Sequence, residues 1–210
     1  MNLCASHPIA RSSITPKQPY ATSTRVPVLL VPGLHDSGPG HWQTLWHERN
    51  PTFVRVRQHD VGTPDLDRWA ATVAVAIDRL DAPPIIAAHS FGCLAAIRSV
   101  VHGRAIAGAL LVAPADPDHF GVAPLLETRR LPFATTLVAS SNDPWLKLVK
   151  AGVLATRWGS RFVPCRDAGH INADSGLGEW PFGFALLREL IDRVTTPEPP
   201  RSAARSPSAH

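Results

Sequence analysis

The sequence predicts an α/β fold in which helices cover both faces of a mostly parallel central sheet. Short apolar segments rich in β-branched residues alternate along the chain with segments of helical periodicity, which is the pattern of repeated strand–helix units. Several of the apolar segments carry no polar face, as expected for strands buried between two layers of helices. In such sheets, functional sites lie beyond the carboxyl ends of the strands.

Six short segments, each rich in apolar residues, are predicted to form the strands. They are residues 26–31, 53–58, 84–89, 105–113, 134–140 and 160–165. The predicted helices are residues 65–80, 92–101, 144–158 and 180–194. In the first helix, apolar residues from Leu66 to Ile77 recur at spacings of three and four, so they share one face. The third helix opens with Pro144, which suits a first helical turn.

The 210 residues favour a single compact domain. With 44% hydrophobic and 18% charged residues, the composition is that of a globular protein. Residues 1–24 mix Ser, Thr and Pro without periodicity, and residues 196–210 are rich in Pro and Ser. We therefore expect a flexible leader over 1–24, a folded domain over 25–195 and a disordered tail over 196–210.

The net charge of +4 raises the question of a nucleic-acid partner. Residues 1–24 carry +2 and residues 196–210 carry +1, which leaves only +1 for residues 25–195. No dense cluster of Lys and Arg with interleaved aromatic residues occurs in that central part. Nucleic-acid binding is therefore not expected.

The cysteines and the apolar runs bear on where the protein resides. Cys4, Cys93 and Cys165 are odd in number and form no Cys-x-x-Cys pair, which favours reduced thiols over a secreted disulfide framework. The longest apolar runs, 26–31 and 105–113, are far shorter than the roughly 20 residues that span a bilayer. We expect a cytoplasmic protein without a membrane partner.

The segment 84–100, PIIAAHSFGCLAAIRSV, is the strongest functional signal in the chain. An apolar strand runs into Ser90 and turns directly into a helix. Small residues two positions before and after the serine, Ala88 and Gly92, permit a tight turn that exposes the serine hydroxyl at the sheet edge. Ala88 stands where glycine is usual, which is a small change in size. Ser90 is predicted to be a nucleophile; the alternative is a serine that caps the helix.

A serine hydroxyl is a good nucleophile only when a base takes its proton. His170 follows the last predicted strand, in a loop that would reach the same sheet edge as Ser90, and is predicted to be the base. Asp143 also follows a strand and completes the chain order serine, acid, histidine that suits this kind of turn. It is predicted to orient the imidazole and stabilise its cation. Asp116 and Asp167 are alternatives, and Asp143 would equally suit a helix cap.

Two backbone amides are predicted to stabilise the negative charge that develops on a substrate oxygen. One is the N–H of Phe91, next to the nucleophile, and the other is the N–H of Leu34, in the glycine-containing loop after the first strand. The same loop lacks the glycine and lysine pattern of nucleotide-binding loops. No organic cofactor is therefore expected.

The remaining histidines and the tryptophans give further candidates. His35, His41 and His47 recur every six residues, a spacing that matches no common metal motif, so no metal site is expected. His89 adjoins Ser90 and is expected to point away from it. Four residues in or beside the predicted site loops are candidate substrate-binding residues: His35, Trp42, Trp145 and Trp180.

Four motifs together resemble the small serine hydrolases of the retinoblastoma-binding protein 9 and YdeN-like family, within the α/β-hydrolase superfamily. They are VPGLHDSGPGHWQTLW, AHSFGC, SSNDPW and AGHINADSGLGEWP, and the similarity covers about residues 26–194. The resemblance implies a catalytic triad of Ser90, Asp143 and His170, a compact fold with little or no cap, and esterase-like activity. It implies no particular substrate.

These observations predict a serine hydrolase that cleaves a small carboxylic ester through an acyl-enzyme. An amide or peptide bond is the alternative substrate. A hydrolase-fold binding protein with a vestigial triad is the alternative of another class. The expected partner is a small ester or amide molecule, and the sequence identifies no protein partner.

Overall fold

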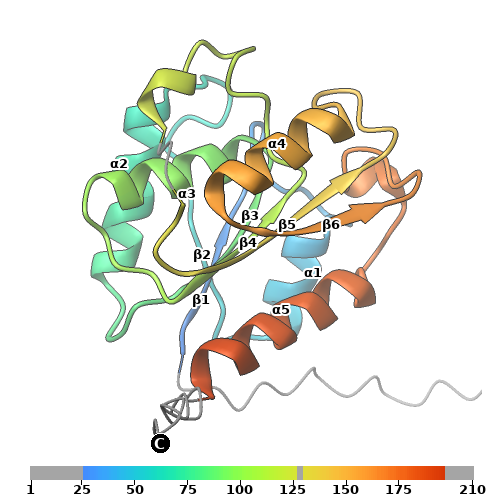
Figure 1. Ribbon diagram of the computed structural model, residues 1–210. Helices are drawn as coiled ribbons and strands as arrows, with labels where there is room; N and C mark the ends of the chain where they lie inside the picture. Colours follow the sequence, from blue (N-terminus) through green and yellow to red (C-terminus); the bar gives the residue numbers. More distant parts are fainter. Residues whose placement is uncertain (1–25, 127–129, 197–210) are drawn as a thin grey trace, which may run out of the picture.

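The computed structural model describes residues 26–126 and 130–196. Within these ranges, six parallel strands form one sheet in the order β2-β1-β3-β4-β5-β6, and helices cover both of its faces (Figure 1). The predicted α/β fold is confirmed. The expected leader, and all but the first residue of the expected tail, lie outside the described residues.

Every strand falls within a predicted segment. The strands are β1 Val28–Val31, β2 Val54–Arg55, β3 Ile85–His89, β4 Gly108–Val112, β5 Ala134–Ser140 and β6 Arg161–Cys165. The side chains of β1, β3 and β4 are all buried, which explains why these segments show no polar face. β2 lies at one edge of the sheet and is the shortest strand, with two residues that pair with β1.

Five α-helices accompany the strands in the described ranges. They are α1 Trp42–Arg49, α2 Leu66–Asp78, α3 Phe91–Val101, α4 Leu148–Trp158 and α5 Pro181–Thr195, with short 3-10 helices η1 Ala123–Leu125 and η2 Ala173–Ser175. α1 was not predicted. The predicted start of α4 at Pro144 is wrong: the Asp143 carboxylate accepts the N–H of Trp145 at 2.9 Å, which turns the chain before the helix begins.

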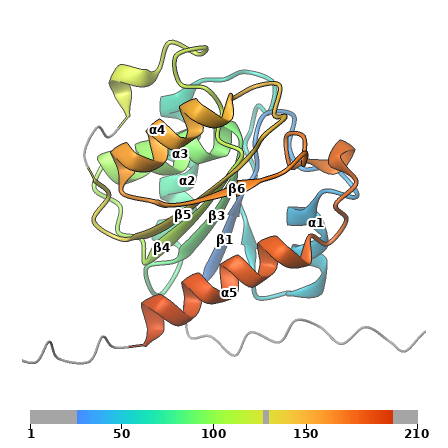
Figure 2. The same cartoon turned by 45° about the vertical axis from the view of Figure 1, so that its right-hand side comes forward.

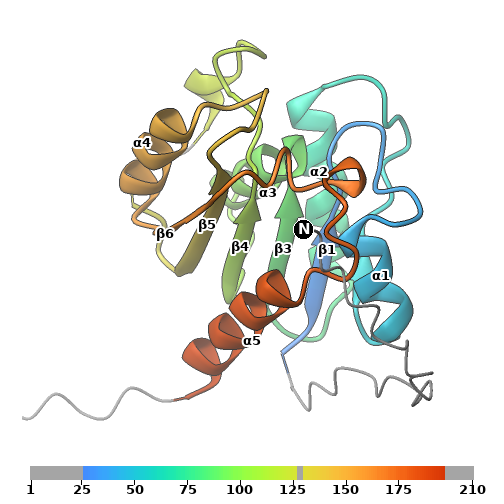
Figure 3. The same ribbon diagram turned by 90° about the vertical axis from the view of Figure 1, so that its right-hand side faces the viewer.

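The helices divide the core into two layers. α2, α3 and α4 lie on one face of the sheet, and α1 and α5 lie on the other (Figures 2 and 3). The layer beneath α1 and α5 is rich in aromatic side chains, including Trp42, Trp46, Trp180 and Phe184. None of the helices in the described part of the chain is long and apolar enough to span a bilayer.

The carboxyl end of β1 and the start of α3 approach each other very closely. A Cβ atom at Gly92 would lie 2.6 Å from the carbonyl oxygen of Val31 and would also clash with that of Pro32. Because these are backbone atoms, no rotamer change could relieve the contact. Gly92 is therefore required for α3 to begin directly after β3.

We predict that Gly92→Ala lowers the free energy of unfolding by about 2 kcal/mol, because overpacking against fixed backbone typically costs about 1–3 kcal/mol. Gly152→Ala in α4 is the matched control. A Cβ atom at Gly152 would meet only the Phe162 ring, at an ordinary 3.7 Å.

The control should gain about 0.5–1 kcal/mol, since glycine is a poor residue inside a helix. Urea unfolding of both variants beside the wild type gives the two values. A Gly92→Ala protein as stable as the wild type would contradict the close approach.

Candidate active site

Ser90 lies between β3 and α3 in a backbone conformation that few residues adopt. Its φ is 53° and its ψ is −124°, and its N–H donates to the carbonyl of Val112 at 3.1 Å. Such strain persists only where the surrounding structure enforces it, and it is common at functional sites. The Ser90 side chain makes no capping hydrogen bond to α3. The helix-cap interpretation is therefore wrong.

The structure brings Ser90, His170 and Asp143 together. Ser90 Oγ lies 2.9 Å from His170 Nε2. On the other side of the ring, His170 Nδ1 lies 2.9 Å from Asp143 Oδ2 and 3.1 Å from Oδ1. With the ring proton on Nδ1, that N–H donates to the carboxylate and Nε2 accepts from the serine hydroxyl. The carboxylate is buried, whereas the imidazole is partly exposed.

Three consecutive side chains, from the last residue of β5 and the two residues after it, hold the loop that carries His170. The N–H groups of residues 167, 168 and 169 donate to Ser141 Oγ, Ser140 Oγ and Asn142 Oδ1 at 2.9, 2.9 and 2.7 Å, respectively. Asp143 comes next in the chain. The segment that carries Asp143 is thereby joined directly to the segment that carries His170.

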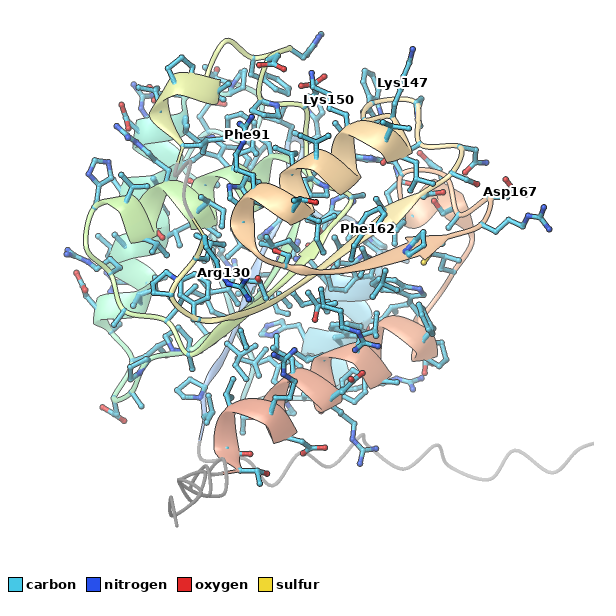
Figure 4. All side chains as sticks on the ribbon, in the orientation of Figure 1. Phe91, Arg130, Lys147, Lys150, Phe162 and Asp167 are labelled. Atoms are coloured by element: carbon cyan, nitrogen blue, oxygen red, sulfur yellow. The ribbon has the colours of Figure 1, made fainter. Side chains whose placement is uncertain are left out.

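The two alternative acids have other partners. Asp116 accepts a hydrogen bond from Lys150 Nζ at 2.7 Å, and Lys150 also pairs with Asp118 at 2.6 Å. Asp167 accepts from the Ser141 hydroxyl at 3.0 Å. Lys150 and Asp167 lie near the carboxyl ends of the strands, whereas Arg130 lies near the opposite ends (Figure 4). Both carboxylates thus lie near the site without contacting the His170 ring.

The amides of Leu34 and Phe91 lie at the carboxyl ends of the strands, beside Ser90, and are available to donate to a bound molecule. The N–H groups after Leu34 are engaged: His35 donates to Val61 and Asp36 to Gly33. Among the described residues, no backbone carbonyl accepts from the Leu34 amide. The Phe91 amide belongs to the first residue of α3 and so lacks an intrahelical partner. A Cβ atom at Gly33 would lie only 2.7 Å from Ser90 Cβ, so this loop lies against the serine.

A cavity of about 630 Å³ opens beside Ser90, a usual size for a small-molecule site. Its walls include Leu34, His35, Asp116, Phe120 and Trp145. The Trp145 side chain is well exposed at 64%, and its ring centre lies 6.5 Å from that of His170. His35 and Trp145 are therefore placed where a substrate could contact them.

Trp42 and Trp180 do not line this cavity, so their prediction as substrate-binding residues is wrong. They are only 1% and 5% exposed, and their rings pack together in the core with centres 5.4 Å apart. Loop position alone could not distinguish them from Trp145, because a tryptophan at a loop boundary can point either inward or outward.

Two further histidines lie beside His170: the sequence gave no role to His41, and it indicated only a packing or supporting role for His89. His89 Nε2 donates to the main-chain carbonyl of His170 at 2.9 Å. The rings of His41 and His170 each lie 4.8 Å from that of His89, edge to face. Burial lowers the pKa of His89 well below its ordinary value. Burial, followed by the nearby Arg55 charge, lowers the pKa of His41 to about 4. Both rings are therefore neutral at pH 7.

The described cysteines are not built for reactivity. Cys93 is buried and its thiol donates to the carbonyl of Val112 at 3.5 Å. Burial raises the pKa of the thiols of both Cys93 and Cys165. Within residues 26–126 and 130–196, no group of three or more His, Cys, Asp or Glu side chains is arranged to hold a metal ion.

Comparison with known proteins shows which family this chain resembles. Residues 28–189 match the family model described as serine hydrolase. A YdeN-like hydrolase from Pectobacterium atrosepticum is 39% identical, with a TM-score of 0.78 over 80% of this chain and 92% of that chain. No curated protein sequence gives a significant match.

Two more distant structures share the fold. The ydeN gene product of B. subtilis is 19% identical, with a TM-score of 0.67 over 80% of this chain and 99% of that chain. The esterase RhEst1 from Rhodococcus sp. is 16% identical, with a TM-score of 0.59 over 80% of this chain and 91% of that chain. The resemblance inferred from the four sequence motifs is confirmed.

The buried histidines predict that the protein loses stability in mild acid. Between pH 6.5 and pH 4 the unfolded chain protonates His41 whereas the folded protein does not, so the free energy of unfolding falls as the pH falls. From pH 7 to pH 5, His41 alone should contribute a loss of about 2 kcal/mol. Urea unfolding at the two pH values measures the loss.

His41→Asn provides the comparison. The His41 ring accepts the N–H of Gln43 as the N-cap of α1, and asparagine is an equally good cap that does not titrate. The variant should lose about 2 kcal/mol less than the wild type between pH 7 and pH 5. Equal losses in the two proteins would show that His41 is not buried as a neutral ring.

Proposed function

This chain belongs to the serine hydrolase family, and we propose that it cleaves small carboxylic esters through a covalent acyl-enzyme. The observation that carries the proposal is the continuous hydrogen-bonded series from Ser90 through His170 to Asp143. A serine paired with a histidine, which is in turn paired with a carboxylate, is the arrangement that activates a hydroxyl for attack on a carbonyl.

In the first half of the reaction, Ser90 Oγ attacks the ester carbonyl carbon while His170 Nε2 takes the hydroxyl proton. The Nδ1–H of the resulting imidazolium stays bonded to the buried Asp143 carboxylate. When the tetrahedral intermediate collapses, the bond to the alcohol oxygen breaks and Nε2 returns its proton to that oxygen. The alcohol leaves and the acyl group remains on Ser90.

In the second half, a water molecule takes the place of the alcohol. Its oxygen attacks the acyl carbon while Nε2 takes one of its protons, and collapse then returns that proton to Ser90 Oγ. The carboxylic acid is released. The amides of Leu34 and Phe91 are suited to stabilise both oxyanions, because the Gly33 loop lies against Ser90 on one side and α3 begins on the other.

An ester is proposed in preference to an amide because the alcohol is a better leaving group than an amine. The described residues between β4 and β5 form only the 3-10 helix η1 and loop, and part of this loop lines the cavity, but no separate cap domain is present among these residues. Leu34 and Phe120 supply apolar wall, and the exposed Trp145 flanks the opening. These features support a short acyl group held against Leu34 and Phe120.

A fluorophosphonate should form one covalent adduct, on Ser90, detectable by intact mass and peptide mapping. His170→Ala should slow the labelling by about 1,000-fold or more, because the hydroxyl then has no base. Asp143→Asn should slow it by a similar factor, because the imidazole loses its orientation and its preferred tautomer.

Asp116→Asn is the matched control, since Asp116 lines the same cavity but pairs with Lys150. Its labelling rate should stay within about threefold of the wild-type rate, as expected for a surface carboxylate outside the triad. A control that slows labelling as much as Asp143→Asn would refute the assignment of the acid. No adduct on folded wild-type protein would refute the nucleophile and favour a binding protein.

An acyl-chain series of p-nitrophenyl esters tests the proposed substrate class. We expect acetate and butyrate esters to be hydrolysed with a kcat/KM about tenfold or more above that of decanoate, because no cap domain among the described residues covers the cavity, so the far end of a long chain would stay in water. Matched short-chain anilides should react more slowly than the esters. Fastest turnover of decanoate, or of the anilides, would contradict the proposal.

A further inference from the structure

The loop that carries His170 has an unusual backbone. Asp167, Gly169 and Ile171 all have positive φ, of 49°, 55° and 51°, so residues of left-handed conformation stand on both sides of the proposed base. Positive φ is a genuine outlier for a β-branched residue such as Ile171. The two non-glycine residues, Asp167 and Ile171, keep this conformation only where their surroundings impose it.

Two buried aromatic rings hold this strained part of the loop. His89 Nε2 donates to the carbonyl oxygen of His170 at 2.9 Å, and Trp42 Nε1 donates to that of Ile171, also at 2.9 Å. The two acceptors are consecutive carbonyls, and the two donors come from β3 and α1. The Ile171 side chain is itself fully buried in the core.

We propose that His89 and Trp42 form a clamp that positions His170: their ring N–H groups hold two consecutive carbonyls of the base loop and so fix the imidazole between Ser90 and Asp143. The proposal rests on the proposed function, because it assigns to these rings a role in the action of that base. His89 and Trp42 are positioning residues, since neither would touch the reacting atoms.

The clamp is anchored to the sheet. The His41 ring packs edge to face against His89, with centres 4.8 Å apart, and lies tilted by 34° against Trp42, with centres 5.3 Å apart. Gln43, two residues after His41, is fully buried. Its Nε2 donates to the carbonyls of Val31 and Ala87 at 3.1 and 2.9 Å. The start of α1 is therefore tied to β1 and β3, and it carries Trp42 with it.

The clamp complements the hydrogen bonds made by Ser140, Ser141 and Asn142. Those three side chains hold the N–H groups of residues 167–169, whereas His89 and Trp42 hold the carbonyls of residues 170 and 171. Loss of the clamp would free the half of the loop that carries the imidazole. The contact between the loop and the Asp143 segment would stay.

The first test compares Trp42→Phe with Trp46→Phe. Both residues are buried in α1, and Trp46 Nε1 also donates to a main-chain carbonyl, that of Glu179 at 2.7 Å. Each variant loses one indole N–H bond, but only Trp42 holds the base loop. We expect Trp42→Phe to lower the kcat for the best ester by about 10–100-fold with KM within threefold, and Trp46→Phe to lower stability only.

The second test compares His89→Leu with His89→Gln. Leucine removes the donor, whereas glutamine offers an amide N–H at a similar distance from the backbone. We expect a loss of kcat of about 10–100-fold in His89→Leu, recovered to within about threefold of the wild type in His89→Gln. Because His89 adjoins Ser90, the Trp42 variants separate an effect on the base from an effect on the nucleophile.

A proton NMR signal provides a measurement that needs no substrate. The Nδ1–H of His170, bonded to Asp143, should give a resonance far downfield of the backbone amides in the wild type and in Trp46→Phe. In Trp42→Phe and His89→Leu the resonance should broaden or disappear, because the imidazole no longer keeps its place. Thermal unfolding shows which variants are folded.

The clamp is refuted if folded Trp42→Phe and His89→Leu keep both the wild-type kcat and the downfield resonance. It is also refuted if Trp46→Phe lowers kcat as much as Trp42→Phe, since a general disturbance of the core would then explain both. Failure of the wild type to hydrolyse any ester or to react with fluorophosphonate would instead refute the proposed function. In that case the downfield resonance would still report whether His89 and Trp42 hold the imidazole.

Discussion

The close contact between the end of β1 and the start of α3 is the constraint on which the site depends. Because Gly92 has no side chain, the first turn of α3 lies against the carbonyl oxygens of Val31 and Pro32. The β1 loop then passes directly beside Ser90, where Gly33 avoids a second clash. This close approach places the strained Ser90 and the amides of Leu34 and Phe91 together at the carboxyl ends of the strands.

The hydrogen-bond donors that hold the His170 loop are uncharged, and this has an electrostatic consequence. A cation buried beside His170 would compete with the imidazolium for the Asp143 carboxylate. Burial instead keeps the rings of His41 and His89 neutral, and hydroxyl, amide and indole groups make the other contacts to the loop. The network can therefore be rigid without opposing the positive charge that the proposed proton transfer would place on His170.

The strands and the three residues of the proposed triad could be predicted because short stretches of the sequence indicate them. The sheet strands followed from short apolar runs, and Ser90, Asp143 and His170 could be chosen because each follows such a run. α1 could not be predicted in this way, since its polar residues interrupt the apolar period. The predicted start of α4 was wrong. The Asp143 carboxylate accepts the N–H of Trp145, and this contact overrides the preference of Pro144 for a first helical turn.

The tryptophans show why the direction of a side chain could not be predicted from the sequence. Trp42 and Trp180 lie at the starts of helices and Trp145 lies in the loop between β5 and α4, yet the first two are buried and the third is exposed. Which way each ring points depends on partners distant in sequence, such as the Ile171 carbonyl that Trp42 holds. Trp42 donates to the backbone next to His170, whereas the exposed Trp145 ring lies at the cavity. Under the proposed function, the same residue type thus holds the His170 loop on one side and is exposed to a substrate on the other.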